Sequence, residues 1–279
     1  MTQTGRTLVA GVIGWPVAHS RSPALHGHWF ERYGVDGVYV PFPVPPGRGE
    51  AAVRALAALG IRGCNVTVPH KEAAARAVDR LDSTAQRMGA VNLIIVGEDG
   101  SLEGRNTDGF GFIENLKATI PGWRPEAGPA VVLGAGGAAR AVLVSLLDAG
   151  VPEIRLLNRS RARAEGLAEE FGGPIRVGEW VSRETLLDGA ALLVNTTTLG
   201  MGTNEPLDLD LAALPRDAVV YDIVYNPLVT PLLEHARARG NPTVGGLGML
   251  LHQARPAFAA WFGIDPAVDA DLERAVLGG

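Results

Sequence analysis

Apolar runs of strand length alternate with Ala- and Leu-rich helical stretches along the whole 279-residue chain. This alternation is typical of βα units, whose strands pair in a mostly parallel sheet, and it predicts the α/β class. In the first part of the chain, Gly97-Glu98-Asp99-Gly100 separates two strand-like runs, Gly89–Val96 and Leu102–Asn106. The composition of this segment suits a hairpin turn of four residues, so we expect the first sheet to be mixed.

Three Pro and two Gly residues interrupt all periodicity between Pro121 and Pro129, which predicts a domain boundary there. We expect residues 1–120 to form one domain, completed by residues 246–279, and residues 121–245 to form a second. The length suits two domains, and 47% apolar residues are enough to build their cores.

The charge balance is mildly acidic, with 25 Lys and Arg against 30 Asp and Glu. Such a chain has no general field that attracts nucleic acid or anionic lipid. It also lacks an uncharged apolar stretch long enough to cross a bilayer, and its single cysteine, Cys64, excludes an internal disulfide. Its six His residues show no metal-ligand spacing. We therefore expect a cytoplasmic globular protein without a metal, nucleic-acid or membrane partner.

One glycine-rich turn follows the apolar run Ala130–Leu133 and precedes a helical stretch. It reads Gly134-Ala135-Gly136-Gly137-Ala138-Ala139 and has the spacing G-x-G-x-x-A. A dinucleotide pyrophosphate needs glycines at these places, for a tight turn and for close approach to free N–H groups at a helix N-terminus. A tight turn without a ligand is the alternative interpretation.

The end of the next predicted strand carries arginines instead of a carboxylate. Enzymes that use NAD often have Asp or Glu there, about 20 residues after the glycines, to bind the ribose 2′-hydroxyl. This chain has Asn158, Arg159, Ser160, Arg161 and Arg163. Arginine suits a 2′-phosphate, so the segment favours NADP. The alternative is a solvated helix start, although cations there oppose the helix dipole.

Two serines, Ser20 and Ser22, lie just before a predicted helix over Pro23–Tyr33. Ser22 followed by Pro23 is typical of a helix N-cap. Ser20 has no such structural role, and a hydroxyl beside a helix N-terminus can bind an anion.

Further polar candidates lie in or beside predicted strands. Asn65 and Thr67 share one face of a strand over Arg62–Val68. Lys71 follows in the first turn of a helix, where a cation adds little stability, and it is either a proton donor or a solvated lysine.

Three more polar residues require an explanation. Asn92 lies in an apolar run and is expected to be a buried amide with a defined partner. Asp108 precedes the helical stretch Phe110–Ile120 and is most simply an N-cap. Gln253 lies among apolar neighbours in the last long helix, so it also needs a partner.

Taken in order along nearly the whole chain, six motifs resemble those of the shikimate dehydrogenase family. They are Ser20-Arg21-Ser22-Pro23, Asn65-Val66-Thr67-Val68-Pro69-His70-Lys71, Gly89-Ala90-Val91-Asn92, Asn106-Thr107-Asp108-Gly109, Gly134-Ala135-Gly136-Gly137 with Asn158-Arg159-Ser160, and Gly246-Leu247-Gly248-Met249-Leu250 through Gln253. The chain departs from the family at Gly27, where Asn is frequent, and at Leu93, where Thr is frequent. Neither change removes a group that the chemistry needs.

The resemblance implies a substrate domain with a mixed sheet and a Rossmann-like, doubly wound NADP-binding domain. It also implies reversible reduction of 3-dehydroshikimate to shikimate, a step toward chorismate and the aromatic amino acids, by a monomer or homodimer. A quinate/shikimate dehydrogenase of the same fold and a non-catalytic shikimate sensor are the alternatives.

The resemblance further implies the roles of individual residues. Lys71 would be the proton donor, or would mainly orient the ring, and Asp108 would support it. Ser20, Ser22 and Tyr225 would bind the substrate carboxylate. The hydroxyls of the substrate ring would form hydrogen bonds with Asn65, Thr67, Asn92 and Gln253. Cofactor contacts would come from Gly134, Ala135, Gly136, Gly137, Ala138, Asn158, Arg159, Ser160, Arg163, Thr196, Met201, Ile223, Gly246 and Met249.

Overall fold

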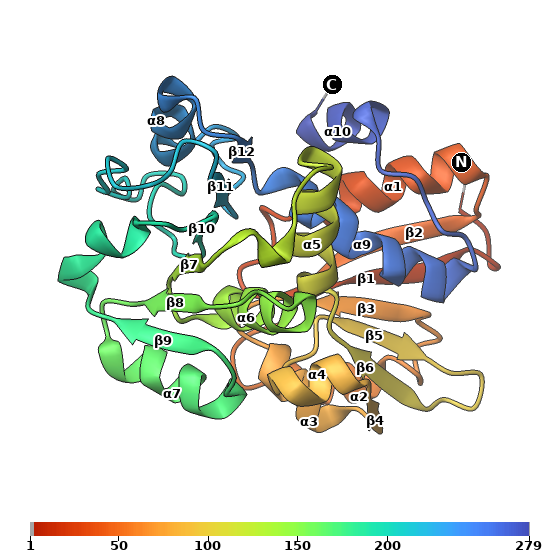
Figure 1. Ribbon diagram of the computed structural model, residues 1–279. Helices are drawn as coiled ribbons and strands as arrows, with labels where there is room; N and C mark the ends of the chain where they lie inside the picture. The colour runs from red at the N-terminus through yellow and green to blue at the C-terminus, as the bar shows by residue number, and fades with distance from the viewer. Residues whose placement is uncertain (1–2, 279) are drawn as a thin grey trace. The chain divides into compact units, whose positions relative to one another are not determined.

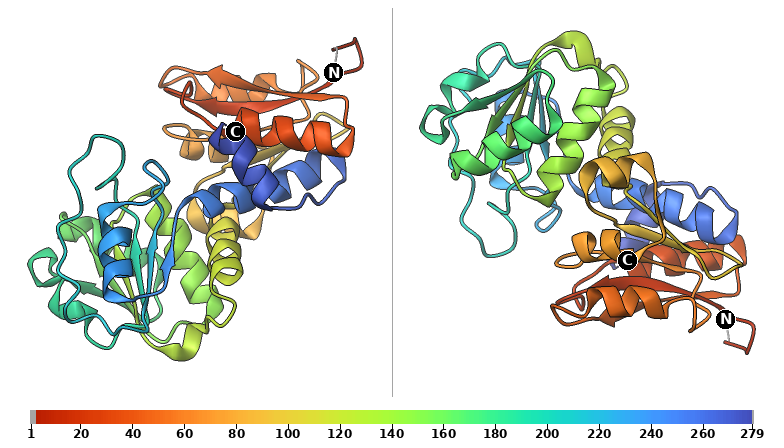
Figure 2. Two further views of the ribbon diagram at one scale, coloured as in Figure 1. Left: turned by 90° about the horizontal axis from the view of Figure 1, so that it is seen from above. Right: turned by 90° about the horizontal axis from the view of Figure 1, so that it is seen from below.

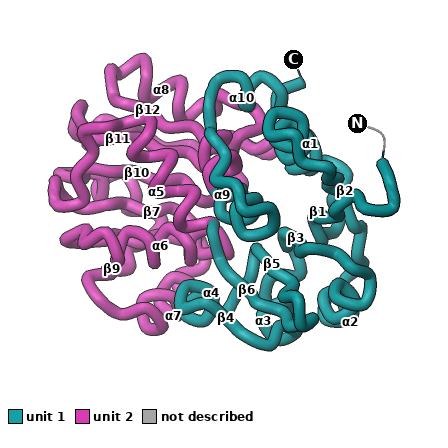
Figure 3. Tube along the Cα trace, turned by 90° about the vertical axis from the view of Figure 1, so that its right-hand side faces the viewer, with its two compact units in different colours: residues 1–107, 253–279 teal, residues 108–252 magenta. Residues whose placement is uncertain are grey.

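The computed structural model describes residues 3–278, which divide into two compact units (Figure 3). Unit 1 comprises residues 1–107 and 253–279, and unit 2 comprises residues 108–252. Each unit has its own six-stranded sheet. Among residues 3–278, no helix is both long and apolar enough to cross a membrane.

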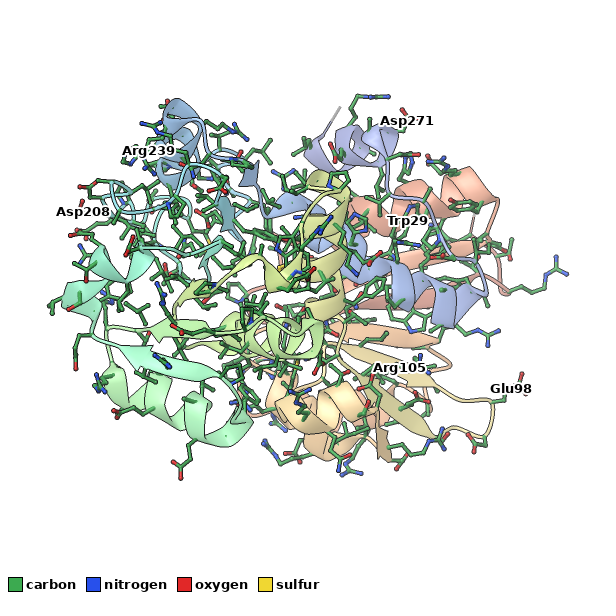
Figure 4. The ribbon with its side chains drawn as sticks, viewed as in Figure 1. Trp29, Glu98, Arg105, Asp208, Arg239 and Asp271 are labelled. Atoms are coloured by element: carbon green, nitrogen blue, oxygen red, sulfur yellow. The ribbon has the colours of Figure 1, made fainter. Side chains whose placement is uncertain are left out.

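The sheet of unit 1 is mixed, which confirms the expectation from the hairpin turn. Its strands are ordered β2 (Gly37–Pro43), β1 (Leu8–Gly14), β3 (Gly63–Val66), β5 (Leu93–Val96), β6 (Leu102–Arg105) and β4 (Arg80–Leu81). Strand β1 runs parallel to β2 and β3, whereas β5 is antiparallel to β3 and β6. Residues 97–100 turn the chain between β5 and β6, with the Glu98 side chain pointing away from the sheet (Figure 4).

Helices cover both faces of this sheet. Helix α1 (Ser22–Tyr33) lies beside α10 (Ala270–Leu277) in Figures 1 and 2. Helix α1 also packs on the C-terminal part of α9 (Leu247–Phe262), where the rings of Phe30 and Phe258 are 5.5 Å apart. On the other face, α2 (Gly49–Ala55) and α3 (Lys71–Ala77) cover Ile13 and Cys64, and α4 (Ser83–Met88) follows. Apolar side chains therefore bury both faces.

Unit 2 has an entirely parallel sheet. The strand order is β12 (Thr243–Val244), β11 (Val219–Asp222), β10 (Leu192–Asn195), β7 (Ala130–Leu133), β8 (Ile154–Leu157) and β9 (Ile175–Gly178). The chain leaves β7 toward β8 and later returns to the other side of β7 with β10. In a doubly wound sheet, ligands bind at this reversal, outside the carboxyl ends of the strands.

Alternating residues of β7 enter different cores, as expected of a sheet with two covered faces. Ala130 and Val132 pack with α5 (Asp108–Thr119), α6 (Gly137–Ala149) and α7 (Arg161–Phe171). Val131 and Leu133 pack on the opposite face with α8 (Pro231–Arg239). Figure 2 shows these helices on both sides of the sheet. The doubly wound fold is thus confirmed.

The division between the units differs from the expected boundary at residues 121–129. Helix α5 belongs to unit 2 because its Phe112 and Leu116 are fully buried in the same core as Val142 and Leu146 of α6. At the other end of unit 2, the division falls inside α9, after His252. The Pro- and Gly-rich segment is a connection between α5 and β7 within unit 2.

Candidate active site

The serine turn of unit 1 differs from the expected cap geometry. Helix α1 begins at Ser22 itself, and the capping residue is Arg21, which has helical backbone angles and makes no side-chain cap bond. The Ser22 N–H donates to Ser20 Oγ at 3.3 Å. The prediction that Ser22 caps the helix is therefore wrong, because the turn begins one residue earlier and Ser20 takes the accepting role.

The strand β3 and the residues after it carry the next group of candidates. Asn65 is buried, and its Nδ2 donates to the carbonyl of Asn92 at 3.2 Å. Thr67 follows the strand and packs against Gly14 of β1, where an added Cβ would lie 2.5 Å from the threonine methyl. Lys71 is the first residue of α3, half-buried, and its carbonyl accepts the Val91 N–H at 3.0 Å. This bond ties the start of α3 to the segment that carries Asn92.

Asn92 is a buried amide with defined partners, as expected. Its Nδ2 donates to Gln253 Oε1 at 3.3 Å, and its Oδ1 accepts the Thr107 N–H at 2.8 Å. The Thr107 hydroxyl in turn donates to the Gln253 carbonyl at 2.8 Å. The structure thereby brings Asn92 and Gln253 together from segments 161 residues apart. The sequence reasoning did not single out Thr107, although it lies directly before Asp108.

Asp108 and Tyr225 belong to unit 2. Asp108 is the first residue of α5, so it lies inside the helix and not at the cap position expected from the sequence. A carboxylate in the first turn is still favoured by the helix dipole. Tyr225 is half-buried and follows β11 by three residues.

The glycine turn of unit 2 has the geometry of a dinucleotide cradle. Gly134 has a φ of +110°, and a Cβ there would lie 2.5 Å from the Thr196 hydroxyl. That hydroxyl donates to the Leu133 carbonyl at 2.7 Å, which joins the carboxyl ends of β7 and β10. Gly136 caps α6 and Gly137 begins it, and both have open space where a side chain would be. Free N–H groups and open space at a helix N-terminus suit a pyrophosphate.

The arginine segment after β8 separates into paired and unpaired side chains. Arg161 is engaged, since its Nε donates to Glu165 at 2.7 Å and its Nη1 pairs with Glu179. Within residues 3–278, Arg159 and Arg163 are exposed and have no ion-pair partner. Asn158 shapes the turn by donating to the Ser160 carbonyl at 2.9 Å. Two unpaired guanidinium groups thus suit an anionic ligand here.

The remaining cofactor candidates lie in loops that follow the strands of unit 2. Ile223 and Met249 both pack against the core formed by α5, α6 and α7. Between them, Gly246 comes so close to the Ile223 carbonyl that a Cβ would lie 2.0 Å from it. Met201 is partly exposed in the turn after β10.

A buried carboxylate that sequence reasoning missed joins two of these loops. Asp222 Oδ1 accepts from Asn195 Nδ2 at 3.0 Å and from the Val224 N–H at 3.1 Å, and its Oδ2 accepts from the Thr230 hydroxyl at 2.7 Å. Burial raises the pKa of Asp222, and these bonds oppose the effect. The sequence signal was a charged residue at the end of an apolar strand.

Two α/β units with these features define a class of protein. Unit 2 can hold a phosphorylated dinucleotide, and unit 1 presents hydroxyl and amide groups suited to a small polar molecule. These features together are those of the nicotinamide-dinucleotide-dependent oxidoreductases.

Comparison with known proteins narrows the class. Family models match residues 12–94 (shikimate dehydrogenase substrate binding domain), 124–199 (shikimate / quinate 5-dehydrogenase) and 246–275 (shikimate 5′-dehydrogenase C-terminal domain). Shikimate dehydrogenase (NADP(+)) of Paramagnetospirillum magneticum is 61% identical over 98% of this chain and 99% of its own. The chain belongs to the shikimate dehydrogenase family.

Solved structures agree with this assignment. Shikimate 5-dehydrogenase from Thermus thermophilus, in complex with NADP(H) and shikimate, has a TM-score of 0.86 and 40% identity over 97% of this chain and 98% of its own. Quinate dehydrogenase from Corynebacterium glutamicum, in complex with NAD, has a TM-score of 0.89 and 29% identity over 97% and 98%.

Proposed function

We propose that this chain catalyses the reversible, NADP-dependent reduction of 3-dehydroshikimate to shikimate in aromatic amino-acid biosynthesis. The observation that carries the proposal is the 61% identity, over nearly the whole chain, to a shikimate dehydrogenase (NADP(+)). The enzyme would act in the cytoplasm as a monomer or homodimer.

NADP would bind to unit 2. The turn Gly134–Ala138 would hold the pyrophosphate, and Ser160 with the unpaired Arg159 and Arg163 would hold the 2′-phosphate. Thr196, Met201, Ile223, Gly246 and Met249 would make further contacts with the cofactor. The open space at Gly136 and Gly137 supports this assignment, because a bound phosphate needs to reach the backbone N–H groups.

Unit 1 would bind most of the substrate. Ser20 and Ser22, with Tyr225 of unit 2, would donate hydrogen bonds to the carboxylate. Asn65, Thr67, Asn92 and Gln253 would read the ring hydroxyls, and the bonds that join Asn92 to Gln253 support a common role for these two.

Lys71 would be the proton donor of the reaction. When bound, NADPH supplies the hydride that reduces the ketone. The Lys71 ammonium would stabilise the negative charge that develops on the ketone oxygen and then protonate it. Asp108 would support Lys71 in this step. In the reverse direction, neutral Lys71 would accept the proton from the shikimate hydroxyl.

The direct test is an assay of the purified protein with shikimate and NADP⁺, read from the absorbance of NADPH. We expect shikimate-dependent reduction of NADP⁺. Activity on quinate equal to that on shikimate would favour a quinate/shikimate dehydrogenase. Binding of shikimate without turnover would indicate the sensor.

A further inference from the structure

A tyrosine outside the six sequence motifs holds one of the proposed substrate-binding side chains. Tyr39 of β2 is 6% exposed, and its hydroxyl lies 2.7 Å from Oδ1 of Asn65 in β3. The two strands flank β1, so the tyrosine side chain extends across it. Ala10 of β1 is the residue opposite Tyr39. Its small side chain leaves room for the ring to pass.

The bonds of Asn65 fix which way its amide points. The carbonyl of Asn92 can only accept, so the Asn65 atom 3.2 Å from it has to be the nitrogen, Nδ2. The amide oxygen consequently faces Tyr39, and the tyrosine hydroxyl is the donor of that bond. One N–H of Asn65 then serves the Asn92 carbonyl. The second N–H is the group that a ligand would use, and the Asn65 side chain also lies within hydrogen-bonding reach of the His26 ring.

Aromatic neighbours fix the Tyr39 ring. His26 of α1 stacks on it with a centroid distance of 4.1 Å and an interplanar angle of 7°, and the Trp261 ring lies 6.2 Å away. His26 is fully buried, and burial lowers its pKa to about 3, so it stays neutral. Burial also raises the pKa of Tyr39 well above its ordinary value, an effect that the Ser22 side chain opposes. The Tyr39 hydroxyl is therefore harder to ionise than that of an exposed tyrosine.

We infer that Tyr39 is a positioning residue, whose hydroxyl holds the Asn65 amide so that Asn65 donates an N–H to an oxygen of the substrate. The inference rests on the proposed function, because it takes Asn65 to be a substrate-binding residue. It predicts that Asn65 recognises the lone pair of a substrate hydroxyl and does not accept that hydroxyl's proton. Without the tyrosine hydroxyl, the amide can rotate.

The variant Tyr39→Phe removes one oxygen and keeps the ring stacked on His26. Loss of a neutral hydrogen bond should raise KM for shikimate about 2- to 12-fold. KM for NADP⁺ should not change, and the KM ratio of variant to wild type should be constant with pH. The matched control is Tyr221→Phe, which removes a buried hydroxyl bonded to Asn115 at 2.7 Å in unit 2. The control should leave KM for shikimate unchanged.

A double-mutant cycle with Asn65→Ser tests whether Tyr39 acts through Asn65. Asn65→Ser alone should raise KM for shikimate, and adding Tyr39→Phe should then have no further effect. Equal effects of Tyr39→Phe in both backgrounds, or an unchanged KM in Tyr39→Phe alone, would overturn the inference while the proposed function stands. A wild-type enzyme without shikimate-dependent turnover would instead overturn the proposed function.

Discussion

Among the single residues, Lys71 has the central role in the proposed reaction, that of the proton donor. It begins a helix, where the dipole gives a cation no stabilising role, yet its backbone is bonded to the segment of Asn92. Lys71→Ala should lower kcat by about 10²- to 10⁴-fold, as is typical of general acid–base groups, with a modest change in KM. Steady-state kinetics of Lys71→Ala, Asp108→Ala and the double variant test this.

If the two residues act in one step, the double variant should be barely slower than Lys71→Ala. Fully multiplicative losses would contradict a shared role for Asp108. A kcat close to that of the wild type in Lys71→Ala would remove the lysine from the chemical step.

The buried carboxylate of Asp222 leads to a prediction about pH. Because burial raises its pKa in the folded state above that in the unfolded chain, folding favours the protonated form. The resulting stabilisation is present below the unfolded pKa and is lost as pH rises through the folded pKa. Asp222→Asn should lack this loss. Urea unfolding of both proteins over the acidic pH range measures it, and identical pH dependence would contradict the account.

At the scale of secondary structure, much of the fold could be predicted because each long element has a local pattern. The apolar run Ala130–Leu133 has the observed bounds of β7, and the predicted helix Pro23–Tyr33 differs from α1 by one residue. Short elements such as β9 were missed, since four residues give little periodicity. Helix α10 was also missed, although Asp269, which accepts the Leu272 N–H, is a readable cap signal.

The polar clusters were only partly predictable. Asn92 and Gln253 could be singled out because each is polar within an apolar segment, but their pairing depends on α9 returning to unit 1. Tyr39 gave no local signal, because its partner is set by the strand order β2, β1, β3 and by the small Ala10 between them. Ser22 does not cap the helix because α1 begins at Ser22 itself, and the Ser22 N–H donates to Ser20 Oγ.

The glycine turn gives a prediction about an element junction. Gly134→Ala places a Cβ 2.5 Å from the Thr196 hydroxyl at a φ of +110°. We expect it to destabilise the protein by about 1–3 kcal/mol and to weaken NADP⁺ binding. Gly166→Ala in α7 is the control, because open space surrounds that position and alanine should stabilise the helix by up to about 1 kcal/mol. Denaturant unfolding and NADP⁺ titration measure both effects. Equal unfolding free energies and equal NADP⁺ affinities in the two variants would contradict this role of Gly134.

In the molecule as a whole, the unit proposed to bind the cofactor and the unit proposed to bind the substrate have separate hydrophobic cores. Unit 2 has the parallel sheet and glycine turn of a dinucleotide-binding domain, and unit 1 has a mixed sheet with buried amides. Variants that affect only one task are therefore expected in each unit. The preference for NADP⁺ should depend on unit 2 alone. It should come from Arg159 and Arg163, which have no carboxylate partner within residues 3–278.

An NADP-dependent dehydrogenase of shikimate is recognised by its kcat/KM for shikimate oxidation, measured with NADP⁺ and with NAD⁺. We expect the wild type to prefer NADP⁺. Arg159→Ala should lower kcat/KM with NADP⁺ by about 10- to 150-fold, the value of a charge-assisted bond, and with NAD⁺ much less. A wild type that uses both cofactors equally well, or an Arg159→Ala variant with an unchanged ratio between them, would contradict the account.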